Sequence, residues 1–169
     1  MSVAAVVLAA GASSRYGTDP PKQVVYLDAV LAALEASAVN DIVVVSGAHP
    51  LPVESVHCAE WAQGPGASLR CGLRALPDET EAAIVVLADR PDLDPRAVDR
   101  VIDYWRANGG DNILVANYET GTRFHPVLIP RVVWADTPDE GFKGWKPGRL
   151  IDCSDLTPPG DVDFSPAGS

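Results

Sequence analysis

The sequence predicts an α/β fold in which a mostly parallel central sheet is flanked by helices. Several short segments of Val, Ile, Ala and Leu lack polar alternation, which is typical of strands buried on both faces of a parallel sheet. Other segments carry apolar residues at helical spacing, and the two kinds of segment alternate along the chain as in βαβ units. The chain has 169 residues, of which 47% are hydrophobic, and this is sufficient for one packed core. We therefore expect a single domain over residues 1–169, without an internal repeat.

The first βαβ unit occupies the N-terminal part of the chain. Residues 2–9 are a run of Val, Ala and Leu that ends at a Gly/Ser segment, and they predict the first buried strand. Residues 26–39 predict a helix, because their apolar side chains follow one another at helical spacing: Leu27, Val30, Leu31, Leu34 and Ala38. The β-branched run at residues 41–45 predicts the second strand.

The alternation continues in the second half of the chain. Residues 67–76 predict a short helix, and residues 83–88 predict another buried strand. Asp94 and Pro95 are the N-cap and first residue of a predicted helix that extends to residue 107, with Gly109 just past its end. Further strands are expected at residues 112–118, 124–129 and 149–153.

The composition argues against several classes of partner. Thirteen Lys and Arg against 23 Asp and Glu give a formal net charge of −10, which is unsuited to binding nucleic acid or an anionic membrane. The apolar runs are far shorter than the roughly 18 residues of a membrane span, and no basic segment precedes the first of them. We therefore expect a soluble, untargeted protein with no nucleic-acid and no membrane partner.

The cysteines predict a reducing environment. Cys58, Cys71 and Cys153 are an odd number, and they form neither a C-x-x-C motif nor a cluster with histidines. We expect neither a disulfide framework nor a structural zinc site, and hence a cytoplasmic protein.

The loop after the first predicted strand has the composition of a phosphate-binding site. Residues 8–17 read Leu-Ala-Ala-Gly-Ala-Ser-Ser-Arg-Tyr-Gly, and Lys22 follows shortly after. Glycines permit close approach of the backbone, exposed N–H and hydroxyl groups can hold phosphate oxygens, and Arg15 and Lys22 add positive charge. The spacing fits neither the P-loop nor the dinucleotide fingerprint, so a solvated turn would be the alternative if this loop stood alone.

An acidic residue is expected at the same edge of the sheet. Asp89 directly follows the strand predicted at residues 83–88, and the carboxyl ends of parallel strands meet at the edge where ligands of open α/β sheets bind. Mg²⁺ requires one or two such carboxylates together with the phosphate oxygens of its substrate. A second carboxylate could come from Asp161 or Asp163, although an acidic, Pro- and Gly-containing tail is more often simply solvated.

Four segments, in chain order, resemble motifs of one enzyme family. Residues 8–17 with Lys22 resemble L-A-A-G-x-S-x-R-x-G…K, and residues 61–72 resemble W-x-x-G-x-x-x-S-L-x-x-G. Residues 87–91 resemble L-x-D-x-P, and residues 125–128 read H-P-V-L. The chain is thereby similar to the nucleotidyltransferases that make nucleotide-linked cofactors, above all to molybdenum cofactor cytidylyltransferase and the molybdopterin guanylyltransferase-like group.

The resemblance implies a single-domain, Rossmann-like nucleotidyltransferase fold and a Mg²⁺-dependent reaction. A nucleotide monophosphate would pass from a nucleoside triphosphate to a phosphorylated cofactor, molybdopterin or the molybdenum cofactor, with release of pyrophosphate. In-line attack by an acceptor phosphate needs charge and position rather than a protein nucleophile, and Arg15, Lys22 and the metal would stabilise the charge on the α-phosphate and pyrophosphate.

The resemblance also implies a role for individual residues. Arg15, Lys22 and Asp89 would be catalytic, Asp89 and Asp163 would bind the metal, and His125 would lie near the acceptor. Ala10 stands where guanylyltransferases carry Gly, which favours CTP over GTP. The expected nucleotide-binding residues are Leu8, Ala9, Ala10, Gly11, Ser13, Ser14, Gly17, Gly66 and Ser68.

The chain departs from the family in two places, and alternatives remain open. A family turn of the form G-x-P-L is absent at the junction of Val25 and Tyr26, and residues 161–166 match D-I-D-T-P only loosely. The acceptor could instead be a sugar phosphate or methylerythritol phosphate, the nucleotide could be GTP, or the chain could be a non-catalytic nucleotide-binding homologue. Such a homologue would serve as a chaperone with a molybdoenzyme partner, and retained CTP binding without turnover would distinguish it.

Overall fold

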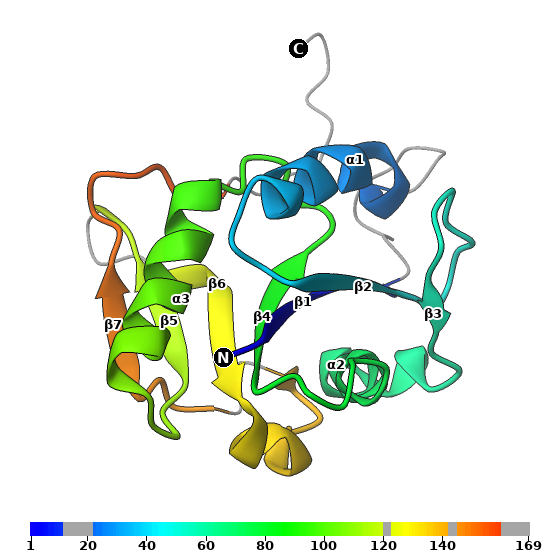
Figure 1. Ribbon diagram of the computed structural model, residues 1–169. Coiled ribbons are helices and arrows are strands. Elements are labelled where there is room, and N and C mark those ends of the chain that lie inside the picture. The colour runs from blue at the N-terminus through cyan, green and yellow to red at the C-terminus, as the bar shows by residue number, and fades with distance from the viewer. Residues whose placement is uncertain (12–21, 120–122, 142–144, 160–169) are drawn as a thin grey trace, which may run out of the picture.

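The computed structural model describes residues 1–11, 22–119, 123–141 and 145–159, with residues 22–24 and 123–124 described by their backbone alone. One seven-stranded sheet organises the chain (Figure 1), and its strand order is β3-β2-β1-β4-β6-β5-β7. The elements are β1 (Val3–Ala9), α1 (Lys22–Glu35), β2 (Asp41–Ser46), β3 (Val56–His57), η1 (Trp61–Gln63), α2 (Pro65–Arg74), β4 (Ala82–Leu87), α3 (Pro95–Asn108), β5 (Leu114–Asn117), β6 (Arg123–Pro130), η3 (Arg131–Asp136) and β7 (Arg149–Asp152).

The sheet is mostly parallel, as predicted. Strands β1, β2, β3 and β4 all run in the same direction, and β5 and β7 pair in parallel, whereas β6 is antiparallel to both β4 and β5. The central strand β1 is paired on both sides, since Val6 lies opposite Val43 of β2 and Val85 of β4. Its lack of polar alternation follows from this position, because helices cover both of its faces.

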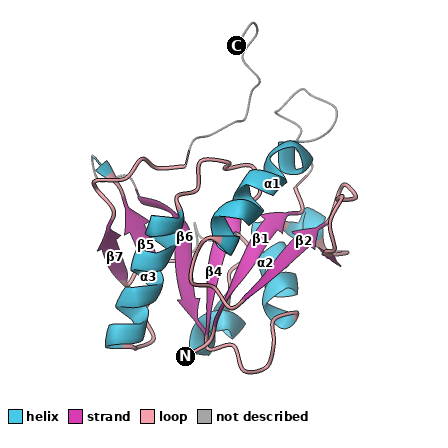
Figure 2. Cartoon of the chain, turned by 45° about the horizontal axis from the view of Figure 1, so that its top comes forward, coloured by secondary structure: helices cyan, strands magenta, loops and turns pink. Residues whose placement is uncertain are grey.

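Helices lie on both faces of the sheet. Figures 1 and 2 show α1 and α3 on one face and α2 on the other. One apolar cluster contains buried side chains of α1 and α3, and a second contains buried side chains of α2 together with Val133 and Trp134 of η3. Helix α2 approaches the sheet closely at Gly72, where an added Cβ would lie 2.5 Å from Val6 Cγ1 and 2.8 Å from Val45 Cγ2.

The predicted elements are found with shifted ends in places. Helix α3 has the predicted caps, because Asp94 Oδ1 accepts a hydrogen bond of 2.9 Å from the Arg96 N–H and Gly109 has a φ of +62°. Helix α1 runs from Lys22 to Glu35 instead of over residues 26–39, and it continues through the Val25–Tyr26 junction without interruption. It ends early because the chain turns toward α3, where the Ala38 N–H donates to Asp99 Oδ1 at 2.8 Å.

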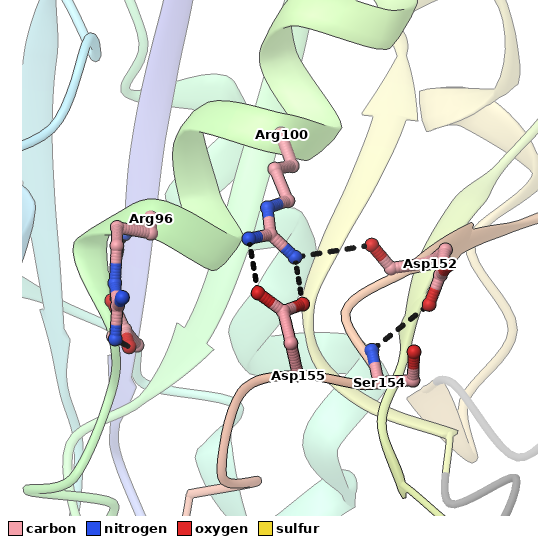
Figure 3. Close-up of polar contacts among 6 residues, drawn as sticks. Arg96, Arg100, Asp152, Ser154 and Asp155 are labelled. Carbon is pink, nitrogen blue, oxygen red and sulfur yellow. Dashed lines mark hydrogen bonds and ion pairs between the residues drawn. The ribbon is translucent and has the colours of Figure 1, made fainter.

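A bidentate ion pair joins the segment after β7 to α3. Arg100 of α3 donates to both carboxylate oxygens of Asp155, at 2.5 and 2.8 Å, and also to the Asp152 carbonyl at 3.4 Å (Figure 3). The guanidinium holds the pKa of Asp155 down at about 2. The chain beyond β7 is thereby attached to the helical face through residue 155.

The expectation that the cysteines form no disulfide is wrong. Cys58, directly after β3, is bonded to Cys71 of α2, with the two Cα atoms 5.8 Å apart. Packing of α2 beside β3 brings the two side chains together, which spacing along the chain does not reveal. Cys153 is a buried free thiol.

Within the described ranges, no helix combines the length and the apolar character needed to cross a membrane.

Candidate active site

The carboxyl ends of β1 and β4 form a cavity of about 320 Å³. The chain leaves β1 toward β2 and β3 on one side and later returns to β4 on the other side, so these two neighbours are a topological switch point. The two strand ends are held together by a hydrogen bond of 3.1 Å from the Ala88 N–H to the Leu8 carbonyl. The residues that line the cavity are Leu8, Ala10, Gly11, Trp61, Ala62, Gly64, Pro65, Ser68, Leu87 and Asp89.

The end of β1 supplies the floor of this cavity. Ala10 is buried, and its carbonyl accepts a hydrogen bond of 3.1 Å from the Ala48 N–H. The neighbouring Gly47 has no room for a side chain, since an added Cβ would lie 2.6 Å from Trp61 Cβ and 2.7 Å from the Ala10 carbonyl oxygen. The hydrogen bond from Ala48 and the close contact with Gly47 therefore fix the position of Ala10. Gly11, the next residue, is exposed.

Asp89 supplies the carboxylate of the cavity. It follows β4 by two residues, and its side chain is only 15% exposed. Its Oδ1 lies 3.8 Å from Nε of Arg90, whose side chain is 14% exposed. A charged pair is thus confined at the sheet edge beside an open cavity, which is a suitable arrangement for binding a cation or a phosphate group.

The opposite wall comes from the segment between β3 and β4. Trp61 and Ala62 of η1, Gly64, and Pro65 and Ser68 of α2 face the cavity. Gly64 is the N-cap of α2 and has a φ of +127°, which favours glycine there. Of this wall only Ser68 was predicted as a site residue, although the W-x-x-G motif already contained Trp61 and Gly64.

A second cavity of about 470 Å³ adjoins the first and is mainly apolar. The two share Leu8, Pro65 and Leu87 in their walls. The remaining lining residues are Leu69, Arg90, Ile113, Val115, His125, Val127, Glu140, Gly141, Trp145 and Pro147. Neighbouring cavities with common walls can hold two reactants side by side.

His125 on β6 lines the second cavity. It is only 7% exposed, and its Nδ1 lies 3.3 Å from the Val85 carbonyl oxygen, which is compatible with the tautomer protonated at Nδ1. Burial lowers the pKa of His125 from 6.5 to about 4, because the charged imidazolium is poorly solvated there. His125 is therefore neutral at physiological pH and cannot neutralise a phosphate.

The structure brings together part of the predicted site. Leu8, Ala10, Gly11, Ser68 and Asp89 line the first cavity, and His125 lines the second. Neither Ala9, which is buried in the apolar core, nor Gly66, whose N–H donates to the Asp139 carbonyl at 3.0 Å, lines either of these two cavities. Lys22 is the first residue of α1, and its side chain is not among the described parts. The remaining predicted residues lie outside the described residues: Ser13, Ser14, Arg15, Gly17, Asp161 and Asp163.

Comparison with protein families matches residues 5–139 to the MobA-like NTP transferase domain. The match covers β1 from residue 5 onward, the switch point and both walls of the first cavity. The chain belongs to the MobA-like NTP transferase domain family. It is therefore a nucleotidyltransferase-like domain, and the cavity at the ends of β1 and β4 is its candidate active site.

Solved structures with the same fold agree with this assignment. Rv0371c from Mycobacterium tuberculosis H37Rv is 26% identical, with a TM-score of 0.78 over 97% of this chain and 94% of that one. A second structure of Rv0371c, in complex with manganese, is 24% identical over 96% of this chain and 94% of that one, with a TM-score of 0.73. A CMP:2-keto-3-deoxy-manno-octonic acid synthetase complexed with CTP is 12% identical over 83% of this chain and 80% of that one, and its TM-score is 0.67. No curated protein matches the chain significantly.

Proposed function

We propose that this MobA-like domain transfers CMP from CTP to a phosphorylated acceptor, releases pyrophosphate and uses Mg²⁺. The observation that carries the proposal is the pair of adjoining cavities at the switch point, one with Asp89 on its wall and the other mainly apolar. A transferase of this class must hold a nucleoside triphosphate and an acceptor side by side, and the common walls of the two cavities meet that requirement.

The first cavity is assigned to the nucleotide. Gly11 begins the glycine loop at its edge, and Ser68 lies on the opposite wall. Ala10 lies on the floor, where replacement of guanylyltransferase-type Gly by Ala favours the smaller cytosine ring, as the family resemblance implies. The CTP complex of the synthetase with the same fold supports a cytidine nucleotide only at the level of the fold.

The residues of the first cavity suit a hard divalent cation. Mg²⁺ prefers oxygen ligands and binds through one or two carboxylates together with substrate phosphates, and Asp89 offers such a carboxylate on the cavity wall. The manganese complex of Rv0371c gives further support, since Mn²⁺ and Mg²⁺ favour similar oxygen ligands. Asp163 or Asp161 would complete the set. A bound Mg²⁺ would offset the negative charge that develops on the phosphates during transfer.

The chemistry requires no protein nucleophile. An oxygen of the acceptor phosphate forms a bond to the α-phosphorus of CTP, while the bond from that phosphorus to the bridging oxygen of the β-phosphate breaks and pyrophosphate leaves with the electron pair. Arg15 and Lys22 are proposed to neutralise the triphosphate, and Asp89 to hold the metal. The protein then contributes position and charge, which are the main terms in phosphoryl transfer.

The second cavity is assigned to the acceptor. Its walls are mainly apolar, and Arg90 supplies a cation that can contact the acceptor phosphate. His125 is neutral there and is proposed to position the acceptor rather than to carry charge. Molybdopterin is the acceptor that the family resemblance favours, and a sugar phosphate or methylerythritol phosphate would need the same phosphate contact.

The substitution Asp89→Asn tests the proposal. It removes the carboxylate charge and keeps the side-chain size, so pyrophosphate release from CTP with molybdopterin and Mg²⁺ should fall about 10²- to 10³-fold, as is usual when one charge-stabilising group is lost. Asp92→Asn is the matched control, because Asp92 is exposed on the same turn and does not line the cavity. Equal activity of Asp89→Asn and wild type would refute the metal assignment. CTP binding by the wild type without turnover with any phosphorylated acceptor would identify a non-catalytic homologue.

A further inference from the structure

The Cys58–Cys71 disulfide closes a loop that forms one wall of the candidate nucleotide cavity. Half of the residues that line this cavity lie between the two cysteines in the sequence: Trp61, Ala62, Gly64, Pro65 and Ser68. The bond therefore joins the two ends of the segment that must remain in place for this wall to exist.

Within the described part of the chain, residues 59–65 of the loop pack on the core through Trp61. Residues 59–65 include no buried residue, and Trp61 and Gly64 are only half buried. At its start, the Cys58 N–H donates to the Ser46 carbonyl at 2.8 Å, and at its end Leu69 and Gly72 of α2 pack on the sheet. The Gly66 N–H adds one hydrogen bond of 3.0 Å to the Asp139 carbonyl. Between these anchors, Trp61 packs against the second apolar cluster and beside Gly47, and the disulfide joins the two ends of the segment.

The sulfur pair lies next to charged side chains that are exposed to solvent. Glu60 Oε2 lies 3.6 Å from Cys58 Sγ and 3.7 Å from Cys71 Sγ, and Arg74 Nη2 lies 3.5 Å from Cys71 Sγ. Both Glu60 and Arg74 are exposed, and Cys71 is slightly exposed whereas Cys58 is fully buried. When Cys71 leaves as a thiolate in the second displacement, the Arg74 guanidinium stabilises its charge, whereas the Glu60 carboxylate disfavours a thiolate at either sulfur.

We infer that Cys58 and Cys71 are a reversible redox modification site that controls the affinity of the cavity for a nucleoside triphosphate. A thiolate of a dithiol reductant forms a bond to Cys71 Sγ, the Cys58–Cys71 bond breaks, and Cys58 leaves with the electron pair and takes up a proton. The second thiol of the reductant then displaces Cys71 in the same way. The reductant loses two electrons and two protons and becomes a disulfide, and the protein gains them as two thiols.

Reduction releases the ends of the loop, so the wall at residues 59–65 gains conformational freedom and the cavity loses order. Triphosphate binding to the reduced form must restore that order, and its affinity falls accordingly. The effect on affinity rests on the proposed nucleotide function, whereas the effect on the loop does not. By linkage, a bound nucleotide disfavours reduction of the disulfide by the same factor by which reduction weakens nucleotide binding.

The test compares oxidised and dithiothreitol-reduced wild-type protein by two independent measurements. Thiol titration in denaturant first establishes the state: one thiol, Cys153, for the oxidised form and three for the reduced form. Hydrogen exchange of peptides that cover residues 58–71 should be faster in the reduced form. Calorimetric titration with CTP and Mg²⁺ should give a Kd about 5- to 150-fold weaker in the reduced form, the usual range of coupling between two sites.

Variants separate the disulfide from other effects of the reductant. Cys58→Ser/Cys71→Ser should behave like the reduced protein in both conditions, whereas Cys153→Ser should keep the full response, because Cys153 lies in the other apolar cluster. Saturating CTP should slow reduction of the Cys58–Cys71 disulfide in the wild type. It should slow this reduction to the same extent in Cys153→Ser.

Each outcome has a definite meaning. Three thiols after mild oxidation, or equal exchange of residues 58–71 in the two states, would overturn the inference. If residues 58–71 exchange faster in the reduced protein but both states bind CTP with equal affinity, the inferred redox control of nucleotide binding is overturned. The proposed function is then unaffected. Faster exchange with no nucleotide binding in either state would overturn the proposed function and with it the nucleotide-dependent half of the inference.

Discussion

Asp89 follows the end of β4, and His125 lies on the neighbouring strand β6. The two side chains differ in their exposure to solvent. Asp89 retains partial exposure on a cavity wall, whereas His125 is almost fully buried on β6. Their contributions therefore differ: Asp89 can bind a cation, and His125 is a neutral hydrogen-bonding residue over the whole physiological pH range.

The depressed pKa of His125 predicts a pH dependence of stability. The unfolded chain takes up a proton at about pH 6.5, whereas the folded protein does so only at about pH 4. The stabilisation that neutral His125 gives the folded state is therefore complete above pH 6.5 and is lost as the pH falls toward 4. The total loss is about 3 kcal/mol. Urea denaturation at pH 7, 5.5 and 4.5 should show a steeper loss for the wild type than for His125→Asn.

The Asn variant is a suitable comparison because its side-chain N–H can still donate to the Val85 carbonyl, although it does not titrate. Asp155 does not contribute to the loss of stability between pH 7 and 4.5, because the stabilisation from its ion pair is lost only as the pH falls from about 3.8 toward 2. The same pH slope in both proteins would show that His125 titrates normally in the folded state.

At the level of single residues, the sequence predicted residues at the ends of β1 and β4 that line the first cavity, but only Ser68 of the opposite wall. The position of Asp89 followed from the rule that ligands bind at the carboxyl ends of parallel strands, and the cavity contains it. Trp61 belonged to the W-x-x-G motif but was not predicted as a site residue, and the Cys58–Cys71 bond was missed because spacing along the chain does not show that β3 and α2 lie side by side. Only the packing of α2 against β3 brings these residues to the cavity.

Among the elements, α2 determines the position of the cavity wall most directly. Its first residues, Pro65 and Ser68, line the cavity, and its later residue Gly72 fixes its distance from the sheet. The absence of a Cβ at Gly72 allows the helix to contact Val6 and Val45 at a distance that no other residue would permit.

Gly72→Ala should therefore destabilise the protein by about 1–3 kcal/mol, because the added methyl group overpacks a rigid interface. Denaturant unfolding of Gly72→Ala, Val6→Ala and the double variant forms a cycle that isolates this contact. Removal of the Val6 methyl groups should offset part of the cost, so that the double variant loses less stability than the sum of the single variants. Strict additivity would show that the helix does not contact the sheet at this residue.

Most elements could be predicted from the sequence, and the exceptions have physical causes. Helix α3 was anticipated nearly to its ends, because its caps are encoded locally by Asp94, Pro95 and Gly109. The end of α1 at Glu35 depends on the tertiary hydrogen bond between Ala38 and Asp99, which no local pattern reveals. Strand β3 was missed because its two residues are too short for any alternation.

At the scale of the whole molecule, a net charge of −10 opposes the binding of a triphosphate. Binding must therefore depend on local cations, and a divalent metal that reduces the charge of the nucleotide should have a large effect. This requirement connects the acidic composition, the carboxylate of Asp89 and the proposed metal dependence in one account.

Isothermal titration of the oxidised protein with CTP and with GTP, each in Mg²⁺ and in a chelator, tests the central claim most directly. We expect CTP to bind more tightly in Mg²⁺ than in the chelator and more tightly than GTP, and we expect the Mg²⁺ effect to disappear in Asp89→Asn. The absence of binding by either nucleotide, or CTP binding that is equal with and without Mg²⁺, would contradict the account.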